Sequence, residues 1–445
     1  MEKILVKNAT IIDSGTRREA DILINDGVIE KIDSSIGLSP STRLVQADGM
    51  YVLPGVIDTH VHFREPGLTH KATFASESLA AVAGGVTTVV DMPNNIPATT
   101  TIEAFEDKCA TARETSAVNY SFMVGATAQN IDEIKKIDVK RVAAVKLFMG
   151  SSTGNMALKE DDRLEELFKE SPVMIATHCE DDAIITANME KAREKYGEDI
   201  PAFMHEIIRD EEACFNSSRE AVEMARKTGA RLHLLHISTE RELELIQNTE
   251  FDSHKMITGE ACSHHLFFCD EDYKRLGNVI KVNPSVKKAS DRDAIWEAVI
   301  SGRIDTIATD HAPHTWEEKS RSYLSCPSGG PMIQHSLLAV LDEVAHGRLT
   351  METAVERMCH TPARLFQMKN RGYIKEGYYA DMTMVELNSP WRVHKENLLY
   401  KCGWSAFEDR MFSSRVRMTM VGGKLAYSNG KAMRSGGARE IEFDR

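Results

Sequence analysis

The 445-residue sequence has no excess of basic charge, since 54 Lys and Arg face 67 Asp and Glu for a formal net charge of −13. A protein that binds nucleic acid needs a basic face, so this balance argues against that class. No apolar run approaches the ~18 residues of a transmembrane helix. The first residues lack a signal-peptide pattern, because their apolar run is short and leads directly into a strand-like segment. We therefore expect a cytoplasmic protein that binds neither nucleic acid nor membrane.

The eight cysteines include no Cys-x-x-Cys pair. Their scatter favours reduced thiols over a disulfide framework or a zinc knuckle. Low-complexity tracts and short internal repeats are also absent. Charged residues make up 27% and hydrophobic residues 42% of the chain, which is an ordinary globular composition. The length fits one large domain and a smaller unit.

Both ends of the chain have the alternating pattern of β-strands. Near the N-terminus, Asn25-Asp-Gly27 separates two alternating segments, which is a hairpin signal. Near the C-terminus, residues 380–386 and 416–421 alternate and Gly422-Gly423 supplies a turn. Neither end is long enough for a core of its own. We therefore predict that residues 1–54 and 371–445 join into one small β-sandwich domain.

Residues 55–370 alternate between short apolar runs and helical patterns, such as 217–227 and 291–300. Together with the run that opens the region, there are eight apolar segments: 51–57, 87–91, 120–124, 143–147, 173–177, 232–236, 256–260 and 306–310. Eight such β/α units predict a (β/α)8 TIM barrel. A doubly wound open sheet is the alternative, but eight strands favour closure.

The most informative segment is Asp58-Thr-His-Val-His-Phe-Arg-Glu-Pro-Gly67, which follows the first apolar run. Residues i and i+2 of a strand point to the same face, so His60 and His62 aim two imidazoles at one point, as a metal ion requires. Arg64 continues that face with a fixed positive charge that can hold a carboxylate bidentately. This pairing suggests a hydrolytic site for a small acidic substrate.

Four further side chains lie at the ends of other predicted strands: Lys146, His178, His236 and Asp310. Barrel enzymes carry their chemistry at the C-terminal ends of the strands. One histidine in a strand is more often a hydrogen-bonded core residue than a ligand. Six candidates at one rim reverse that expectation.

This set of residues fits a two-metal site, in which two ions share a hydroxide that acts as the nucleophile. Four histidines would supply nitrogen ligands and Asp310 an oxygen ligand. Lys146 would supply oxygens if carbon dioxide carbamylates its amine; otherwise it reaches the rim or pairs with a carboxylate. The mixture suits two zinc ions, although manganese or cobalt could bind. Asp310 is also the natural proton shuttle.

The sequence resembles the dihydroorotases of the amidohydrolase superfamily nearly from end to end. The resemblance rests on seven segments in family order: Asp58–Gly67, Asp91–Asn95, Val145–Gly150, Thr177–Glu180, Leu235–Thr239, Lys281–Pro284 and Ala308–His314. It implies reversible cyclisation of N-carbamoyl-L-aspartate to (S)-dihydroorotate in de novo pyrimidine biosynthesis. It also implies a barrel with a binuclear zinc centre and a homodimer.

Carried over by position, the metal ligands implied by the resemblance are His60, His62, Lys146, His178, His236 and Asp310, with Asp310 also the general acid and base. Arg64, Asn94 and His314 correspond to the clamp on the substrate carboxylate, and Asn283 to a contact with the ring. The backbone of residues 328–331 would also face the ring. Lys146 is a departure, because many bacterial long-chain dihydroorotases have aspartate as the bridging ligand. Its context is closer to that of hydantoinases and short-chain dihydroorotases.

Two related activities and one non-enzymatic role stay open as alternatives. Allantoinases and dihydropyrimidinases or hydantoinases share the metal ligands but have no need of a carboxylate clamp. Allantoinase-like sequences tend to carry asparagine in place of Arg64, and dihydropyrimidinases tend to lack the Ala-Pro-His ending completed by His314. A catalytically silent scaffold is disfavoured because no ligand is missing.

Overall fold

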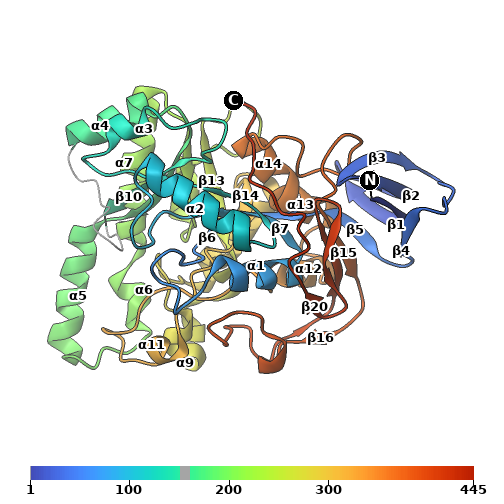
Figure 1. Cartoon of the computed structure of the whole chain (residues 1–445). Coiled ribbons are helices and arrows are strands. Elements are labelled where there is room, and N and C mark those ends of the chain that lie inside the picture. The colour runs from blue at the N-terminus through green and yellow to red at the C-terminus, as the bar shows by residue number, and fades with distance from the viewer. Residues whose placement is uncertain (1, 151–160) are drawn as a thin grey trace.

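The computed structural model describes residues 2–150 and 161–445, which form a barrel with a β-sheet unit beside it (Figure 1). The sheet unit is built from the blue N-terminal and the red C-terminal segments, as Figure 1 shows. Within the described residues, no helix is long and apolar enough to cross a bilayer.

The barrel strands form at seven of the eight predicted positions, and the third position is interrupted at Met123. The first predicted run, 51–57, is divided: its first residues form β5 (Tyr51–Pro54) of the sheet unit, and the barrel strand β6 begins at Val56. Hydrogen bonds give the orders β6-β7-β8 and β9-β10-β11-β12-β13-β14. A parallel bridge between Val61 and His311 closes the ring, and the His62 N–H donates to the His311 carbonyl at 2.8 Å. The predicted TIM barrel is confirmed. Its strands are β6 (Val56–Val61), β7 (Val86–Asp91), β8 (Asn119–Phe122), β9 (Val124–Gly125), β10 (Val145–Gly150), β11 (Ile175–Glu180), β12 (Leu232–Leu234), β13 (Ile257–Cys262) and β14 (Thr306–Ala308).

The helices lie mainly between successive barrel strands. The predicted helical patterns 217–227 and 291–300 lie inside α7 and α10. Asp210 caps α7 by accepting from the Ala213 N–H at 2.9 Å, and Gly229 ends it in the left-handed region. The α-helices are α1 (Phe74–Ala83), α2 (Ile102–Thr115), α3 (Ile131–Ile134), α4 (Asp161–Glu170), α5 (Asp182–Tyr196), α6 (Met204–Ile208), α7 (Glu211–Thr228), α8 (Ser263–Phe267), α9 (Tyr273–Leu276), α10 (Ala289–Ser301), α11 (Trp316–Lys319), α12 (Ser336–Ala345), α13 (Met351–Val355) and α14 (Thr361–Phe366). Shorter helical turns are η1 (Arg241–Leu245), η2 (Asp270–Asp272), η3 (Gly277–Ile280) and η5 (Lys395–Asn397), and η4 (Glu356–His360) is a π-helix.

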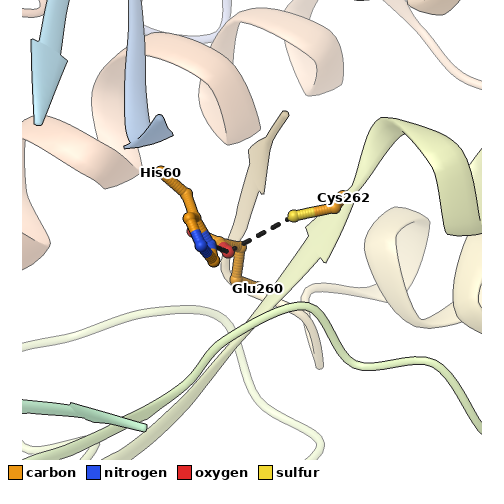
Figure 2. Close-up of side chains that lie close together, drawn as sticks. All are labelled: His60, Glu260 and Cys262. Atoms are coloured by element: carbon orange, nitrogen blue, oxygen red, sulfur yellow. Dashed lines mark hydrogen bonds and ion pairs between the residues drawn. The ribbon is translucent and has the colours of Figure 1, made fainter. Parts of the chain in front are cut away.

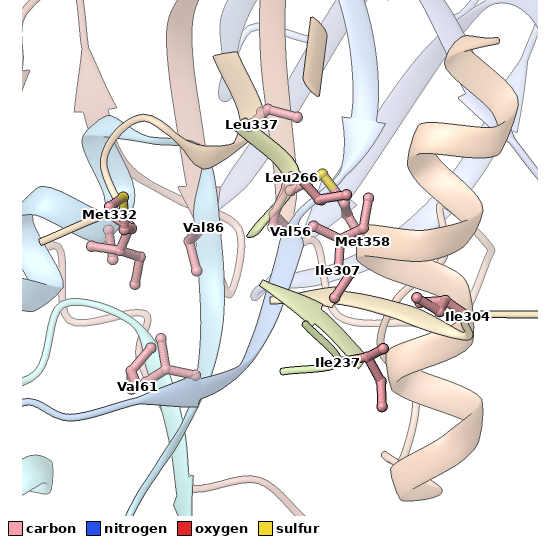
Figure 3. Packing of buried hydrophobic residues seen from close by; sticks show 14 of the residues in the cluster. Val56, Val61, Val86, Ile237, Leu266, Ile304, Ile307, Met332, Leu337 and Met358 are labelled. Atoms are coloured by element: carbon pink, nitrogen blue, oxygen red, sulfur yellow. The ribbon is translucent and has the colours of Figure 1, made fainter. Parts of the chain in front are cut away.

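The barrel wall is apolar on the face that meets the helices. Every residue of β6, β7, β11 and β13 is buried, as expected for parallel strands covered on both sides. Figure 3 shows Val56, Val86 and Ile307 of the strands together with Leu337 and Met358 of the outer layer, all buried in one cluster. Burial of this cluster supplies the main stabilisation of the barrel.

The β-sheet unit joins the two ends of the chain, as predicted. Strand β5 pairs with β15 in antiparallel register, with Tyr51 opposite Val385 and Pro54 opposite Met382. The sheet order is β20-β19-β18-β15-β5-β1-β2-β3, and β4 pairs with β1. Its strands are β1 (Lys3–Asp13), β2 (Thr16–Asn25), β3 (Val28–Asp33), β4 (Thr42–Gln46), β5 (Tyr51–Pro54), β15 (Met382–Glu386), β18 (Arg415–Val421), β19 (Lys424–Ser428) and β20 (Lys431–Ala432); β16 (Trp391–Arg392) and β17 (Met411–Phe412) form a separate ribbon.

Two predicted hairpin turns meet in this unit. The turn at Gly27 joins β2 to β3, and the turn at Gly422-Gly423 joins β18 to β19. Gly423 has φ +73°, and a Cβ there would lie 2.6 Å from the Cα of Gly27. The Ala380 N–H donates to the Gly27 carbonyl at 2.8 Å, and the Gly423 N–H donates to the Ala380 carbonyl at 2.9 Å. The turns therefore tie the two ends of the chain together.

Parts of the C-terminal region pack on the barrel instead of the sheet. The Trp404 indole donates to the His314 carbonyl at 2.8 Å. Farther along, the Ile441 N–H donates to the Tyr120 carbonyl at 2.9 Å, beside β8. The division at residues 54/55 and 370/371 stays a prediction.

Candidate active site

One cavity at the C-terminal ends of the barrel strands collects every side chain singled out from the sequence. His60, His62, Arg64, Asn94, Lys146, His178, His236, Asn283, Asp310 and His314 all line it. Phe148, Arg209, Ala312 and residues 327–329 complete the lining. The structure thus brings the ten residues together, while their catalytic and binding roles stay proposals.

His60 is oriented by a carboxylate behind it. Its Nδ1 lies 2.7 Å from Glu260 Oε1, and both side chains are buried (Figure 2). Burial would raise the pKa of Glu260, but His60 and His233 outweigh burial and hold it well below its usual range. The ionised carboxylate accepts from Nδ1–H, so the lone pair of His60 is on Nε2, which lies 3.3 Å from Asp310 Oδ1.

His62 is oriented in the same way by an amide. Its Nδ1 lies 2.6 Å from Asn94 Oδ1, an atom that can only accept, so the proton is on Nδ1. The lone pair on Nε2 then faces Asp310 Oδ1 at 3.0 Å. Burial lowers the pKa of His62 to about 4, so the ring is neutral near pH 7. Three acceptor atoms converge here without a donor, which is the arrangement that a cation would complete.

A second pair of rings faces the cavity from the other side. His178 Nδ1 and His236 Nε2 lie 3.0 Å apart. His178 Nε2 lies 3.0 Å from Glu180 Oε2, which favours a proton on Nε2 and leaves the lone pair on Nδ1. Burial lowers the pKa of both rings. Two neutral imidazole nitrogens at this separation again fit a shared cation.

Lys146 lies on β10, whose neighbour β11 carries His178. Its side chain is 1% exposed, and burial lowers its pKa to about 8. Across the described residues the ammonium donates no hydrogen bond and forms no ion pair; Nζ lies 4.6 Å from the centroid of the Phe148 ring. The sequence left open that Lys146 pairs with a carboxylate, and no such pair exists among the described residues. A neutral amine in this position is the form that reacts with carbon dioxide.

Arg64 carries a buried charge that lines the same cavity. The residue is 8% exposed, and its Nε donates to the Pro313 carbonyl at 3.1 Å. Burial lowers its pKa to about 10, which leaves it charged near pH 7. Within residues 2–150 and 161–445 it forms no ion pair with a carboxylate, and the neighbouring Glu65 instead accepts from the Phe74 N–H at 2.9 Å. A surface pair between Arg64 and Glu65 is thus excluded.

The backbone that carries these groups is held in an unusual conformation. Arg64, His236 and Asp310 have φ values of +68°, +39° and +45°. Such values are uncommon outside glycine and concentrate at functional sites. The Phe63 N–H, between His62 and Arg64, donates to Asp91 Oδ1 at 2.6 Å. Asp91 Oδ2 in turn lies 2.6 Å from the buried Lys108 Nζ, so an internal ion pair fixes the turn.

The carboxylate clamp and the ring contacts are placed in part as the sequence implied. His314 Nε2 lies 3.1 Å from Arg64 Nη2, so these two clamp members are adjacent. Asn94 also lines the cavity, and it contacts His62 as described above. Asn283 Oδ1 is buried without a hydrogen-bond partner among the described atoms, which suits a contact with a ligand.

Sequence reasoning missed three residues of the site. Glu260 is the last residue of the predicted strand 256–260. Its place at a strand end was the feature of the sequence that could have marked it as a site residue. Arg209 follows the short helix α6 and lines the cavity while pairing with Glu180, but no motif marked it. Phe148 follows Lys146 by two residues on β10 and shares its face.

Comparison with known proteins gives concordant matches. A family model described as "Amidohydrolase family" matches residues 51–426. A dihydroorotase of Methanosphaera stadtmanae is 32% identical over 96% of this chain and 96% of its own length. An allantoinase of Bacillus velezensis is also 32% identical, over 97% of this chain and 96% of its own. The solved structure of an L-hydantoinase (dihydropyrimidinase) from Arthrobacter aurescens has a TM-score of 0.93 at 28% identity, covering 99% of this chain and all of that one.

Proposed function

Because the chain belongs to the amidohydrolase family, we propose that it is a dihydroorotase, which converts N-carbamoyl-L-aspartate to (S)-dihydroorotate and water, and the reverse. The observation that carries this proposal is the buried guanidinium of Arg64 at the rim of the cavity. A buried charge without a carboxylate partner costs several kcal/mol, and an anionic ligand would offset that cost. Dihydroorotate has a ring carboxylate, whereas hydantoin, dihydrouracil and allantoin have none.

The donor atoms of the cavity fit two divalent metal ions, with zinc the best match to imidazole and carboxylate ligands. His60, His62 and Asp310 would hold one ion, His178 and His236 the other, and a carbamate on Lys146 would contact both. Bound there, the ions would polarise the amide carbonyl of the ring and lower the pKa of a water molecule.

The side chains of the chain itself supply positioning and proton transfer. Arg64 and His314 would hold the ring carboxylate, which orients the amide toward Asp310. In hydrolysis, Asp310 accepts a proton from the attacking water and gives it to the ring nitrogen that leaves. In cyclisation the same steps run in reverse: Asp310 takes the proton released by the ureido nitrogen and gives it to the carboxyl hydroxyl, which departs as water.

A hydantoinase or allantoinase activity is the second candidate. The structural likeness to the L-hydantoinase supports it, as does the presence of Lys146 in place of an aspartate. Uncharged rings would use the same metal ligands but would leave Arg64 without a partner. The two proposals therefore differ in one measurable respect, which is the response of the enzyme to the charge of the ring.

The test is turnover of four rings by the zinc-loaded protein: dihydroorotate, dihydrouracil, hydantoin and allantoin. We expect dihydroorotate to have the highest kcat/KM, and Arg64→Met to lower that value by about 100-fold or more, because a buried charge partner is lost. Turnover of dihydrouracil should change less than about threefold. Arg348→Met is the control, since Arg348 pairs with Asp293 on the surface. A preference for an uncharged ring would rule out the proposal.

A further inference from the structure

We propose that Lys71 is a positioning residue that keeps the proton of His314 on Nε2, where it donates to the Ser328 carbonyl, so that Arg64 Nη2 finds no acceptor in this ring and is left to bind the substrate carboxylate. The identity of that carboxylate rests on the proposed function. Lys71 does not line the cavity and belongs to none of the motifs that mark the site in the sequence. Its role comes from the contacts it makes behind His314.

The argument begins with the partner of His314 Nδ1. The Lys71 ammonium lies 2.9 Å from this atom. An ammonium has donors and no acceptor, so Nδ1 must offer its lone pair. A neutral imidazole carries its one proton on the other nitrogen, which places it on Nε2. With the proton on Nδ1, two donors would face each other at hydrogen-bond distance.

The surroundings of His314 keep the ring neutral, so that this choice between tautomers is real. Burial lowers its pKa well below the usual value, and the charges of Arg64 and Lys71 lower it further. The one carboxylate close to the ring is Glu318, whose Oε2 lies 3.7 Å from Nδ1. Glu318 Oε1 is closer to the Lys71 ammonium, at 3.2 Å, and so pairs with that cation.

The protonated Nε2 has one acceptor and one donor beside it. Nε2 lies 3.0 Å from the Ser328 carbonyl and 3.1 Å from Arg64 Nη2. The Nη2 donor favours a lone pair on Nε2, whereas Lys71 and the Ser328 carbonyl favour a proton there, so the loss of Lys71 weakens that preference. With Nε2–H donating to Ser328, Nη2 has no acceptor in this ring and remains available at the cavity wall, where a carboxylate oxygen would accept from it.

Local structure places Lys71 accurately. The Leu68 N–H donates to the Arg64 carbonyl and the Lys71 N–H to the Leu68 carbonyl, both at 3.0 Å, so one compact turn carries both cations. On the other side, Glu318 is held in a capping box at the start of α11, where its Oε2 accepts from the Thr315 N–H at 3.1 Å. Lys71 thus bridges two fixed segments.

The first test needs no substrate. Nitrogen-15 NMR of labelled histidines, with His314→Gln to assign the signal, reports which ring nitrogen carries the proton. We expect Nε2–H in the unaltered protein and a mixture of tautomers in Lys71→Met. A proton on Nδ1 in the unaltered protein would overturn the proposal. Because the metal-loaded protein without substrate suffices, this result is independent of whether dihydroorotate is the substrate.

The second test separates binding from turnover. Lys71→Met should raise KM for dihydroorotate about tenfold or more, because a charge-assisted hydrogen bond is weakened, while kcat changes less than about threefold. Lys71→Arg, which also only donates, should restore most of the affinity. Lys401→Met is the control: Lys401 is a nearby exposed lysine that donates to the Thr69 carbonyl and does not touch His314. A KM for Lys71→Met within twofold of the unaltered value would contradict the proposal.

Discussion

His62 Nε2, His60 Nε2 and Asp310 Oδ1 are three acceptor atoms that meet with no proton available to them. The tautomers of the two rings follow from Asn94, which itself lines the cavity, and from Glu260, which lies behind His60. The ligand geometry is therefore prepared before any ion binds, which is how second-layer partners raise metal affinity.

Substitution of Glu260 tests whether the ligand geometry is set before an ion binds. We predict that Glu260→Gln lowers zinc affinity about tenfold to 100-fold, because the amide oxygen can still accept from His60 Nδ1–H but no longer carries charge. The measurement is competition with a chelator, followed by metal analysis. Cys262→Ala is the control, since Cys262 lies two residues along β13 and only donates to Glu260. Equal zinc affinity in the Glu260 variant and the unaltered protein would refute the prediction.

Burial lowers the pKa of the Lys146 amine and so increases the fraction of the amine that can react with carbon dioxide. With a pKa of about 8, about one-tenth of the amine is neutral at pH 7, against about one part in three thousand at the ordinary value of 10.5. Carbon dioxide reacts with the neutral amine. At fixed dissolved carbon dioxide, we predict that the initial rate of carbamate formation in the metal-free protein rises about tenfold per pH unit between pH 6 and 7 and levels off above pH 8.

Carbon-13 NMR with labelled carbon dioxide measures this carbamate directly. Lys146→Ala should show no such signal, should lose at least one metal ion, and should recover part of its activity with short carboxylic acids. Full activity in Lys146→Ala would mean that another residue joins the two ions.

Among the individual residues, the sequence pointed to the cavity side chains but not to their supporting contacts. The i, i+2 spacing of His60 and His62 was readable because a strand alternates its faces. Arg209 was not, because it reaches the cavity from a short helix whose position depends on tertiary packing.

Strand positions were predicted better than strand boundaries. Seven of the eight predicted runs form barrel strands, and the first, 51–57, is divided between β5 and β6. Strands β12 and β14 end two residues before His236 and Asp310, which lie in the loops that follow. In the N-terminal segment, strand β1 has an irregularity between Val6 and Ala9. Apolar patterns report burial, whereas the ends of ladders depend on partner strands.

The turn between β18 and β19 gives a prediction at the level of elements. Gly423→Ala should destabilise the protein by about 2 kcal/mol or more, because the new Cβ combines a positive φ with a contact to the Gly27 backbone. Gly430→Ala is the matched control. It has φ +88° with no atom within 4 Å, so it should cost only about 1 kcal/mol. Urea unfolding measures the free energy of unfolding of both variants. Equal losses of stability would show that the contact between the two turns contributes nothing.

At the scale of the whole molecule, a chain of net charge −13 keeps a cluster of positive groups at one cavity. Lys281 and Lys319 are buried near Arg64 and donate to backbone carbonyls of residues 281 and 323–327, which border the cavity. Burial lowers the pKa of Lys319 to about 7. Such a local reversal of charge is what a small anionic substrate requires from an acidic protein.

Fold class and the joining of both ends were predictable because each depends on pattern and length. The contacts that residues 389–412 and 439–443 make with the barrel were not predictable. These segments have the same β-like composition as the sheet strands around them. The assignment of 371–445 to the β unit stays a prediction, and the packing of this region includes the hydrogen bond from the Trp404 indole to the His314 carbonyl.

The central claim is that metal ligands and a buried guanidinium line one cavity and together hold one anionic ring. The most direct measurement is a crystal structure with zinc and dihydroorotate, using anomalous scattering at the zinc edge. We predict one zinc peak among His60, His62 and Asp310, another between His178 and His236, and the ring carboxylate within hydrogen-bond distance of Arg64. A carboxylate directed to solvent, or zinc bound elsewhere, would contradict the claim.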